Sequence, residues 1–322
     1  MKLEEIGFYT LTDHRARIAN IYSNLHRCEL ILTDRCNFNC TYCRGIDEKY
    51  SFTPLEKACE IVNMWSEDGL KNIRFSGGEP TLYDGISNLI ALSKSNGIER
   101  IALSTNGSAD FQLYEWLIRL GLNDISISLD SCCSLTFNKM CGIGESNMFE
   151  KVFDNIKKLS KLTYVTIGMV INENNLDSLN LLIGRMSETN VSDIRIVPSA
   201  QYSSKLNIIK RIIPKYVKYP ILKYRIENYL SQRNIRGIYK DDYNKCPLVL
   251  DDMAVANGFH FPCIIYFREG GNPIGYYYDR VKSRKERYDW YKSHNTSEDF
   301  ICKNNCLDVC VDYNNKWRCF QS

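Results

Sequence analysis

Three cysteines within eight residues are the feature of this chain best suited to chemistry. Cys36, Cys40 and Cys43 form a C-x3-C-x2-C pattern directly after the apolar segment 29–32. A closed four-iron cluster takes four cysteine thiolates, so three thiolates leave one iron free to bind an outside ligand. A structural zinc site is the alternative, although such sites are usually built from two cysteine pairs or from mixed Cys/His pairs.

A Gly-Gly-Glu-Pro loop lies about 35 residues further along, at the end of a second predicted strand. Gly77 and Gly78 allow another backbone to approach closely, and Pro80 restricts the shape of the loop around Glu79. An isolated Gly-Gly pair is more often a simple turn. The Gly77-Gly78 pair is informative because it follows the cysteine triplet.

Together the two motifs resemble the signature of the radical S-adenosylmethionine (SAM) superfamily, with Tyr42 in the aromatic position before the third cysteine. The resemblance implies a [4Fe–4S] cluster whose free iron binds SAM, with Gly77, Gly78, Glu79 and Pro80 near the SAM amino group. An electron would then cleave SAM to a 5′-deoxyadenosyl radical that takes hydrogen from a substrate. A reducing partner such as flavodoxin or ferredoxin is implied as well.

Short β-rich segments alternate with longer helical patterns through the first 200 residues. Strands are predicted at 28–33, 72–76, 99–104, 123–129, 163–171 and 192–197. Helices are predicted at 54–68, 83–96, 110–120, 147–160 and 175–188. This alternation predicts an α/β fold with a parallel sheet, either open and doubly wound or a partial barrel. The resemblance favours a partial (β/α)6 barrel followed by a small cysteine-rich domain.

Polar residues at two further strand ends complete the expected SAM site. Ser104 and Asn106 follow the third predicted strand, and Ser128 and Asp130 follow the fourth. The carboxyl ends of parallel strands share one edge of the sheet, where such folds place their active sites. The resemblance implies that these four residues face SAM.

One position departs from the family pattern. Relatives often carry an arginine for the SAM carboxylate where this chain has Cys141, and Lys139 is a nearby basic residue that could replace it. A thiol beside the radical site could instead donate a hydrogen atom. We therefore predict Cys141 as a catalytic residue.

Six cysteines crowd the last 77 residues. Cys246, Gly258 and Cys263 form a C-x11-G-x4-C pattern that resembles the opening of the auxiliary iron–sulfur extensions called SPASM and Twitch domains. The four later cysteines are Cys302, Cys306, Cys310 and Cys319. One auxiliary [4Fe–4S] cluster, held by Cys246, Cys263 and two of the later four, is favoured; a second cluster and a zinc site are the alternatives. His260, inside the hairpin, is interpreted as a structural histidine.

Composition and charge limit the partners. Fourteen cysteines without a signal peptide or an apolar membrane span indicate a cytoplasmic protein with metal chemistry rather than disulfides. Residues 201–245 carry 11 Lys and Arg against 3 Asp and Glu. That stretch, which includes Lys205, Lys210, Arg211 and Lys215, is either a solvated helical face or a platform for an acidic substrate.

Four regions follow from these patterns: an N-terminal extension at 1–27, the barrel at 28–200, a basic linker or helical segment at 201–245 and the auxiliary-cluster domain at 246–322. The predicted function is that of a radical SAM oxidoreductase or maturase acting on a small polar metabolite or a ribosomally made peptide. A nucleotide substrate is the alternative within this class, and no motif supports a nucleic-acid partner. A non-catalytic electron carrier or a zinc-stabilised binding protein is the alternative from another class.

Overall fold

The computed structural model describes residues 13–200 and 218–321, which form two compact units. The first unit contains residues 13–35, 44–102 and 236–321. The second contains 36–43, 103–200 and 218–235. The chain leaves the first unit for the eight residues that carry the cysteine triplet and then returns to it.

Three parallel strands form the centre of the first unit. β1 (Arg27–Ile31) lies between β2 (Asn72–Ser76) and β7 (Asp252–Ala256), and Leu30 pairs with Phe75 on one side and with Val255 on the other. All residues of β2 and β7 are buried. Continuous burial is typical of strands that are covered on both faces, and it includes the polar side chains of Asn72, Arg74 and Ser76 in β2.

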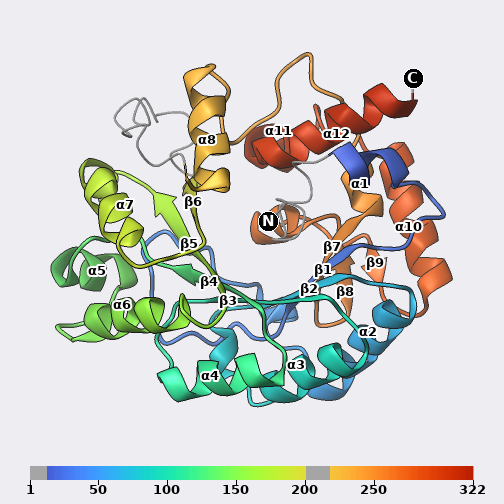
Figure 1. Cartoon of the computed structure of the whole chain (residues 1–322). Coiled ribbons are helices and arrows are strands. Elements are labelled where there is room, and N and C mark those ends of the chain that lie inside the picture. The colour runs from blue at the N-terminus through green and yellow to red at the C-terminus, as the bar shows by residue number, and fades with distance from the viewer. Residues whose placement is uncertain (1–12, 201–217, 322) are drawn as a thin grey trace. The chain divides into compact units, whose positions relative to one another are not determined.

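Helices α2 (Leu55–Glu67) and α3 (Ile86–Ser95) pack against each other in this unit (Figure 1). In α2 the buried residues are Ala58, Ile61, Val62 and Trp65, which recur at helical spacing along one face. A short helix, α1 (Asp13–Ile18), packs against α12 (Asp308–Gln321). Single 3₁₀ turns lie at Glu48–Tyr50, Pro80–Leu82 and Pro247–Leu250.

The second unit repeats the alternation of strand and helix. Its parallel strands are β4 (Asp124–Ser128), β5 (Tyr164–Ile171) and β6 (Asp193–Pro198), and β3 (Arg100–Thr105) crosses from the first unit into the second. Its helices are α4 (Phe111–Leu120), α5 (Ser134–Cys141), α6 (Met148–Leu159), α7 (Leu179–Ser187) and α8 (Pro220–Leu230). A 3₁₀ turn at Leu176–Ser178 precedes α7.

All six predicted strands and all five predicted helices are present, with ends that differ by at most four residues. The α/β fold with parallel strands is therefore confirmed. Helix α5 was not predicted, and it contributes directly to the site described below. The basic residues Lys205, Lys210, Arg211 and Lys215 lie outside the part of the chain that the structure describes.

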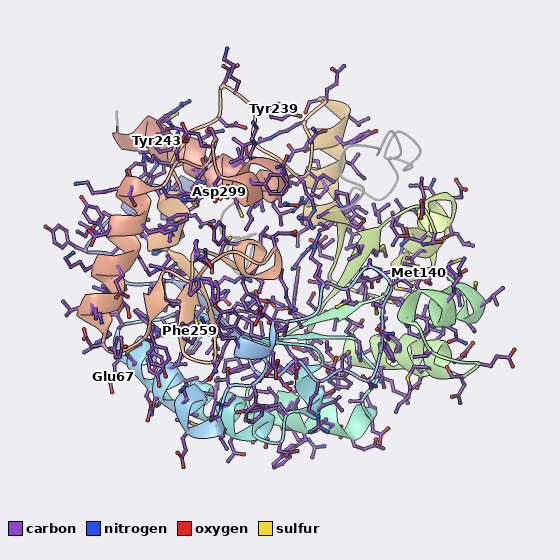
Figure 2. The ribbon with its side chains drawn as sticks, turned by 180° about the vertical axis from the view of Figure 1, so that it is seen from behind. Glu67, Met140, Tyr239, Tyr243, Phe259 and Asp299 are labelled. Carbon is purple, nitrogen blue, oxygen red and sulfur yellow. The ribbon has the colours of Figure 1, made fainter. Side chains whose placement is uncertain are left out.

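The cysteine-rich region begins with a hairpin. β7 and β8 (Phe259–Phe261) are antiparallel, and Asn257 and Gly258 turn the chain between them with positive φ angles of 46° and 82°. The side chain of Phe259, labelled in Figure 2, packs against Tyr50, with ring centroids 5.5 Å apart. The hairpin was predicted, but the pairing of β7 with β1 was not.

Four helices and a short strand complete the region. They are α9 (Ile264–Arg268), β9 (Gly275–Tyr276), α10 (Arg280–Ser293), α11 (Phe300–Asn305) and α12. The division into four regions at 27, 200 and 245 remains a prediction. Among the described residues, no helix is both long and apolar enough to cross a lipid bilayer.

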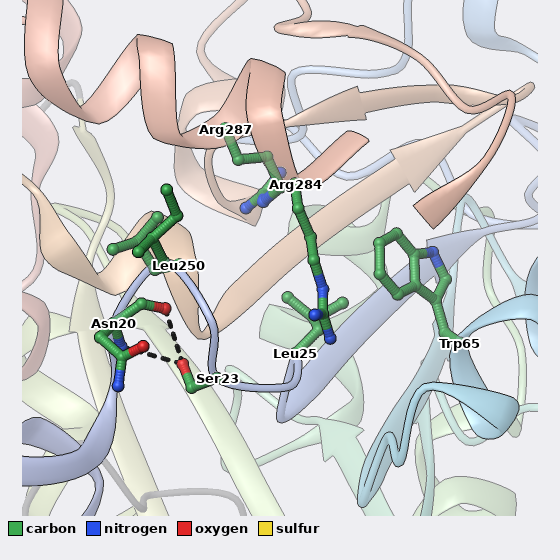
Figure 3. Close-up of a pocket in the computed structure, with 8 residues that line it drawn as sticks. Asn20, Ser23, Leu25, Trp65, Leu250, Arg284 and Arg287 are labelled. Carbon is green, nitrogen blue, oxygen red and sulfur yellow. Dashed lines mark hydrogen bonds between the residues drawn. The ribbon is translucent and has the colours of Figure 1, made fainter. Parts of the chain in front are cut away.

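A pocket lined by Trp65, Leu250, Arg284 and Arg287 lies beside α10 (Figure 3). Arg284 donates to Asp68, which satisfies its charge within the protein. The buried Arg287 donates to the backbone carbonyl oxygens of four residues, namely Val249 at 2.8 Å, Phe261 at 3.0 Å, Pro262 at 3.3 Å and Asp252. The Arg287 guanidinium therefore joins α10 to both strands of the hairpin, and we interpret this pocket as structural.

Arg287→Met should destabilise the protein by about 3 kcal/mol or more, because it leaves several buried carbonyl oxygens without a donor. Urea unfolding followed by circular dichroism measures this effect. Lys285→Met is the matched control on the same helix, since Lys285 is exposed and pairs with Asp289 at the surface. The control should change stability by less than about 0.5 kcal/mol. Equal unfolding midpoints for the two variants would contradict the structural role.

Candidate active site

The loop that carries Cys36, Cys40 and Cys43 packs against the end of α5 within the second unit. The Asn39 N–H donates to the carbonyl oxygen of Cys141 at 2.8 Å, and the Thr41 N–H donates to that of Met140 at 3.0 Å. Gly142 follows with φ +62°, and a Cβ there would lie 2.3 Å from the Asn39 carbonyl oxygen. Only glycine permits this approach, so Gly142 fixes the path of the cysteine loop.

Polar groups surround the first cysteine. The Phe38 N–H donates to Cys36 Sγ at 3.5 Å, and Asn106 Nδ2 lies 3.8 Å from the same sulfur. Asn106 also donates to Asn37 Oδ1 at 2.8 Å, and Asn37 donates to Ser108 Oγ at 2.8 Å. Hydrogen bonds to sulfur stabilise a thiolate and adjust the potential of a cluster that it holds.

The second cysteine has a thiol neighbour. A hydrogen bond from the Cys141 thiol lowers the pKa of Cys40, against the opposing effect of burial. The same hydrogen bond, together with burial, raises the pKa of Cys141. Cys141, which was predicted from the sequence as a hydrogen-atom donor, therefore lies directly beside a predicted iron ligand. Cys43, the third cysteine, is exposed.

Tyr42 and Asp130 contact each other. The Tyr42 hydroxyl donates to Asp130 Oδ2, and the Val170 N–H donates to Asp130 Oδ1 at 2.5 Å. Burial raises the pKa of Asp130 to about 6, and the Tyr42 hydrogen bond acts in the opposite direction. Both carboxylate oxygens thus accept from the protein's own donors, so Asp130 positions the Tyr42 ring. At the neighbouring strand ends, Ser128 is exposed and Ser104 is half-buried.

The Gly-Gly-Glu-Pro loop belongs to the first unit, where it contacts the segment that leads into the triplet. The Gly78 N–H donates to Thr33 O at 2.6 Å, and the Glu79 N–H donates to Arg35 O at 2.8 Å. A Cβ on Gly78 would lie 2.3 Å from Asp34 O and 2.4 Å from Arg35 O. Arg35 immediately precedes Cys36 in the chain, so the loop contacts the segment that leads into the triplet.

The remaining residues of this loop stabilise its shape. The fully buried Glu79 accepts from the Thr81 N–H at 3.0 Å and from the Thr81 hydroxyl at 2.7 Å. Pro80 opens the 3₁₀ turn at Pro80–Leu82. The carbonyl oxygen of Gly77 accepts from Arg268 Nη2 at 2.7 Å. Glu79 therefore caps its own loop.

Five of the six C-terminal cysteines line a single cavity in the first unit. They are Cys246, Cys263, Cys302, Cys306 and Cys310. Most of the other lining residues are apolar, among them Leu248, Pro262, Ile265, Ile301 and Leu307. The sixth, Cys319, is exposed and does not line the cavity. It follows Cys310 by nine residues on α12, about two and a half turns, which places it on the opposite side of the helix.

The hairpin explains how distant cysteines reach this cavity. Cys246 comes just before β7, and Cys263 comes just after β8, where its sulfur accepts from the Tyr266 N–H at 3.4 Å. Burial, with the charge of Cys310 second, raises the pKa of Cys246 to about 11. Burial and the charges of Cys246 and Cys263 raise the pKa of Cys302. Buried thiolates that lie this close together require a cation to compensate their negative charges.

His260, in the same hairpin, does not point to a ligand role. Its side chain is fully buried and its Nε2 lies 3.0 Å from Glu286 Oε2. Burial and the charge of Arg287 lower the pKa of His260 to about 3. The ring is neutral and engaged by the protein, which agrees with the structural interpretation.

Several neighbours of these cysteines were not predicted from the sequence. Asn37 and Ser108 beside Cys36 gave no motif-level signal. His294 and Asp299 lie close to Cys302, and the only sequence signal was an acidic residue three positions before a cysteine, the spacing of a helix cap. The structure brings these groups together through turns that the sequence pattern did not predict.

Comparison with known proteins agrees with this geometry. Residues 30–182 match the sequence model of the Radical SAM superfamily. GTP 3′,8-cyclase from Petrotoga mobilis is 34% identical over 262 residues, which cover 72% of this chain and 79% of that protein. Probable GTP 3′,8-cyclase from Sulfurisphaera tokodaii is 27% identical over 195 residues, 56% of this chain and only 61% of that protein. The chain belongs to the radical SAM superfamily.

Solved structures show the same fold. SuiB from Streptococcus suis bound to S-adenosylmethionine matches with a TM-score of 0.63 at 16% identity, over 91% of this chain and 70% of SuiB. Native anSMEcpe with bound AdoMet matches with a TM-score of 0.59 at 17% identity, over 92% of this chain and 94% of that one. These structures share the fold of this chain. The sequence matches assign the chain to the radical SAM enzymes, as the sequence predicted, and its C-terminal region is rich in cysteine.

Gly142→Ala should reduce iron incorporation at the cysteine triplet by displacing Asn39, because the new Cβ cannot fit beside the Asn39 carbonyl oxygen. Iron content after anaerobic reconstitution measures the loss, which we expect to be about half of the total if a second four-iron cluster is present. Gly144→Ala is the matched control, since no atom lies within 4 Å of a Cβ at that position. Equal iron content in both variants would show that the Gly142 contact does not hold the loop.

Proposed function

We propose that this chain reductively cleaves S-adenosylmethionine and abstracts hydrogen from its substrate with the help of an auxiliary [4Fe–4S] cluster. Four of the five cysteines around the C-terminal cavity hold that cluster in this proposal. The gathering of five thiols at one cavity, from segments as far apart as Cys246 and Cys310, is the observation that carries it.

The residues fit such a cluster. A four-iron cluster takes four thiolates, and the cavity offers five, in largely apolar surroundings. Iron would supply positive charge to stabilise the thiolate forms of these buried cysteines. A zinc ion would also take four ligands but needs no cavity of this kind, so the cavity favours the larger group.

At the N-terminal triplet, the proposal gives each residue a separate task. Cys36, Cys40 and Cys43 hold the cluster that binds SAM, and this cluster supplies the electron for cleavage. Asn106 and the Phe38 N–H donate hydrogen bonds to the Cys36 sulfur, which stabilise its thiolate and adjust the potential of the cluster. Tyr42 is oriented by Asp130.

The family resemblance assigns further residues to the proposed SAM site. By the family resemblance, Gly77, Gly78, Glu79 and Pro80 would lie near the SAM amino group, and Glu79 stabilises this loop through Thr81. Ser104 and Ser128 lie at the ends of strands β3 and β4, where they would face the nucleoside part of SAM.

Cys141 keeps two possible tasks in this proposal. As a hydrogen-atom donor it would return hydrogen to a substrate radical. As a positioning residue it would donate a hydrogen bond to Cys40 and so adjust the potential of the cluster. Measuring deuterium transfer into the product distinguishes the two roles. Unaltered transfer in Cys141→Ala would exclude Cys141 as a hydrogen-atom donor. A changed cluster potential in this variant would support its role as a positioning residue.

Two substrate classes are proposed, each with its own support. The match to SuiB bound to its precursor peptide SuiA, at a TM-score of 0.59 and 15% identity, concerns the fold and leaves a peptide or small polar metabolite as the first candidate. The sequence similarity to GTP 3′,8-cyclases favours a nucleotide as the second. Incubation with GTP, and with peptides encoded beside the gene, distinguishes them by which compound increases the yield of 5′-deoxyadenosine.

Wild-type protein reconstituted under anaerobic conditions should hold about eight irons and eight sulfides, and Cys263→Ala should hold about four. SAM and dithionite should yield 5′-deoxyadenosine with wild-type protein but not with Cys36→Ala. Cys59→Ala, which replaces a half-buried thiol on α2, is the control for general effects of losing a cysteine.

Two results would overturn the proposal in different ways. About four irons in the wild type, unchanged in Cys263→Ala, would exclude the auxiliary cluster. Absence of 5′-deoxyadenosine with full iron content and each candidate substrate would exclude SAM cleavage and favour an electron carrier.

A further inference from the structure

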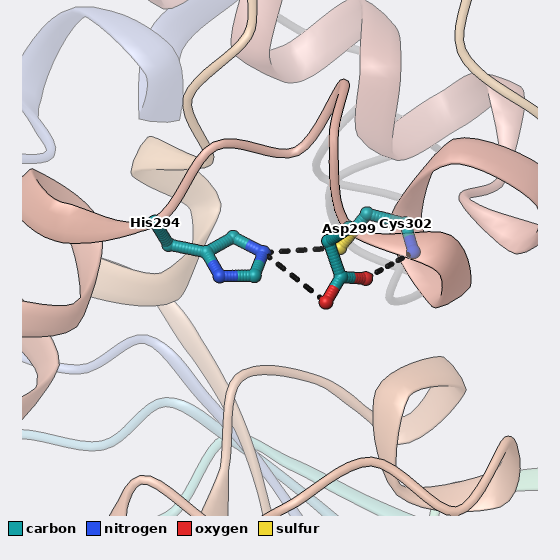
Figure 4. A group of neighbouring side chains, drawn as sticks. All are labelled: His294, Asp299 and Cys302. Carbon is teal, nitrogen blue, oxygen red and sulfur yellow. Dashed lines mark hydrogen bonds and ion pairs between the residues drawn. The ribbon is translucent and has the colours of Figure 1, made fainter.

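Three side chains beside the cysteine cavity present metal-binding atoms to one another. His294 follows α10, Asp299 caps α11, and Cys302 lies in the first turn of α11 (Figure 4). His294 Nε2 lies 3.6 Å from Cys302 Sγ and 3.9 Å from Asp299 Oδ2, and all three ligand atoms lie within 4.8 Å of one another. An imidazole nitrogen and a thiolate on one tetrahedral zinc ion are separated by about 3.5 Å.

The imidazole is held in its orientation by aromatic rings. Trp290 stacks on His294 with ring centroids 3.9 Å apart, and Tyr266 contacts the ring edge-on at 6.1 Å. Lys245 donates to the His294 carbonyl oxygen at 2.9 Å, which fixes the backbone. Figure 4 shows the Nε2 side of the ring directed at Asp299 and Cys302.

The carboxylate is oriented as well. Asp299 Oδ1 accepts from the Cys302 N–H at 2.7 Å, which leaves Oδ2 directed toward the imidazole. The Tyr266 hydroxyl donates to Oδ2 at 3.0 Å. A carboxylate oxygen can accept that hydrogen bond and bind a metal at the same time, and such outer partners commonly orient metal ligands.

The number of cysteines leaves one to spare. A closed four-iron cluster uses four thiolates, and five line the cavity. Cys302 has a nitrogen ligand and an oxygen ligand at metal-binding distance, and it is the one of the five found in such a group among the described residues. The other four, Cys246, Cys263, Cys306 and Cys310, are enough for the cluster.

We propose that His294 Nε2, Asp299 Oδ2 and Cys302 Sγ bind a single divalent metal ion, of which Zn²⁺ fits best, next to the auxiliary cluster. Mixed nitrogen, oxygen and sulfur ligands suit a borderline ion such as zinc rather than calcium or magnesium. Three protein ligands leave a fourth position for water or for a substrate group, as in zinc sites that are not purely structural. The assignment of Cys302 rests on the proposed function, because it presumes that the other four cysteines hold the cluster.

Zinc analysis of the full, anaerobically reconstituted chain tests the site. Wild-type protein should bind one Zn²⁺ per chain in competition with a chromophoric chelator, in addition to its iron. Asp299→Asn should weaken Zn²⁺ binding by more than about tenfold, since losing an outer partner alone commonly costs 10- to 100-fold. Asparagine can still cap α11, so this variant should fold. Asp279→Asn is the matched control, because Asp279 caps α10 by accepting from Lys282 N at 2.8 Å.

Cys302→Ser and His294→Ala should lose Zn²⁺ while keeping the full iron content. Co²⁺ in place of Zn²⁺ should show one thiolate charge-transfer band, which Cys302→Ser removes. Loss of about four irons in Cys302→Ser would overturn the proposal, because it would make Cys302 a cluster ligand. Absence of Zn²⁺ binding to the wild type would also overturn it. So would equal Zn²⁺ affinities of Asp299→Asn and Asp279→Asn. The absence of an auxiliary cluster would be recognised by a different result, namely an iron content in Cys263→Ala equal to that of the wild type.

Discussion

The loop that carries Cys36, Cys40 and Cys43 depends on two backbone contacts that exclude any side chain. Gly142 lies against the Asn39 carbonyl oxygen inside the second unit, and Gly78 lies against those of Asp34 and Arg35 inside the first. Hydrogen bonds between the same segments place the loop without using the sulfur atoms. The backbone therefore determines the path of the loop that carries the three cysteines.

A different principle operates in the C-terminal region. There the hairpin β7–β8 and the helices α11 and α12 bring five thiols to one apolar cavity, where burial disfavours their charged forms. Arg287 joins the hairpin to α10 by donating to backbone carbonyl oxygens, and its charge only partly opposes the effect of burial on the pKa of Cys246. Such an arrangement is costly for an apoprotein and suits one that binds metal.

Much of the fold could be predicted because its signals are local. Alternating apolar strands and amphipathic helices such as α2 are determined by the order of neighbouring residues, and all six predicted strands and five predicted helices are present. The parallel pairing of β7 with β1 could not be predicted, because it joins residues more than 200 positions apart and has no local signal. Helix α5 was missed because its sequence has only a weak apolar periodicity.

The sequence by itself determined the class of chemistry. The spacing of Cys36, Cys40 and Cys43 and the loop at Gly77–Pro80 are properties of the chain, since ligand number and backbone freedom follow from residue type. Only the tertiary structure decided which groups meet: Cys141 with Cys40, Asp130 with Tyr42, and Cys302 with His294. It also separated Cys319 from the other C-terminal thiols. These contacts depend on turns and helix faces that bring distant residues together, and spacing along the chain does not encode such distances.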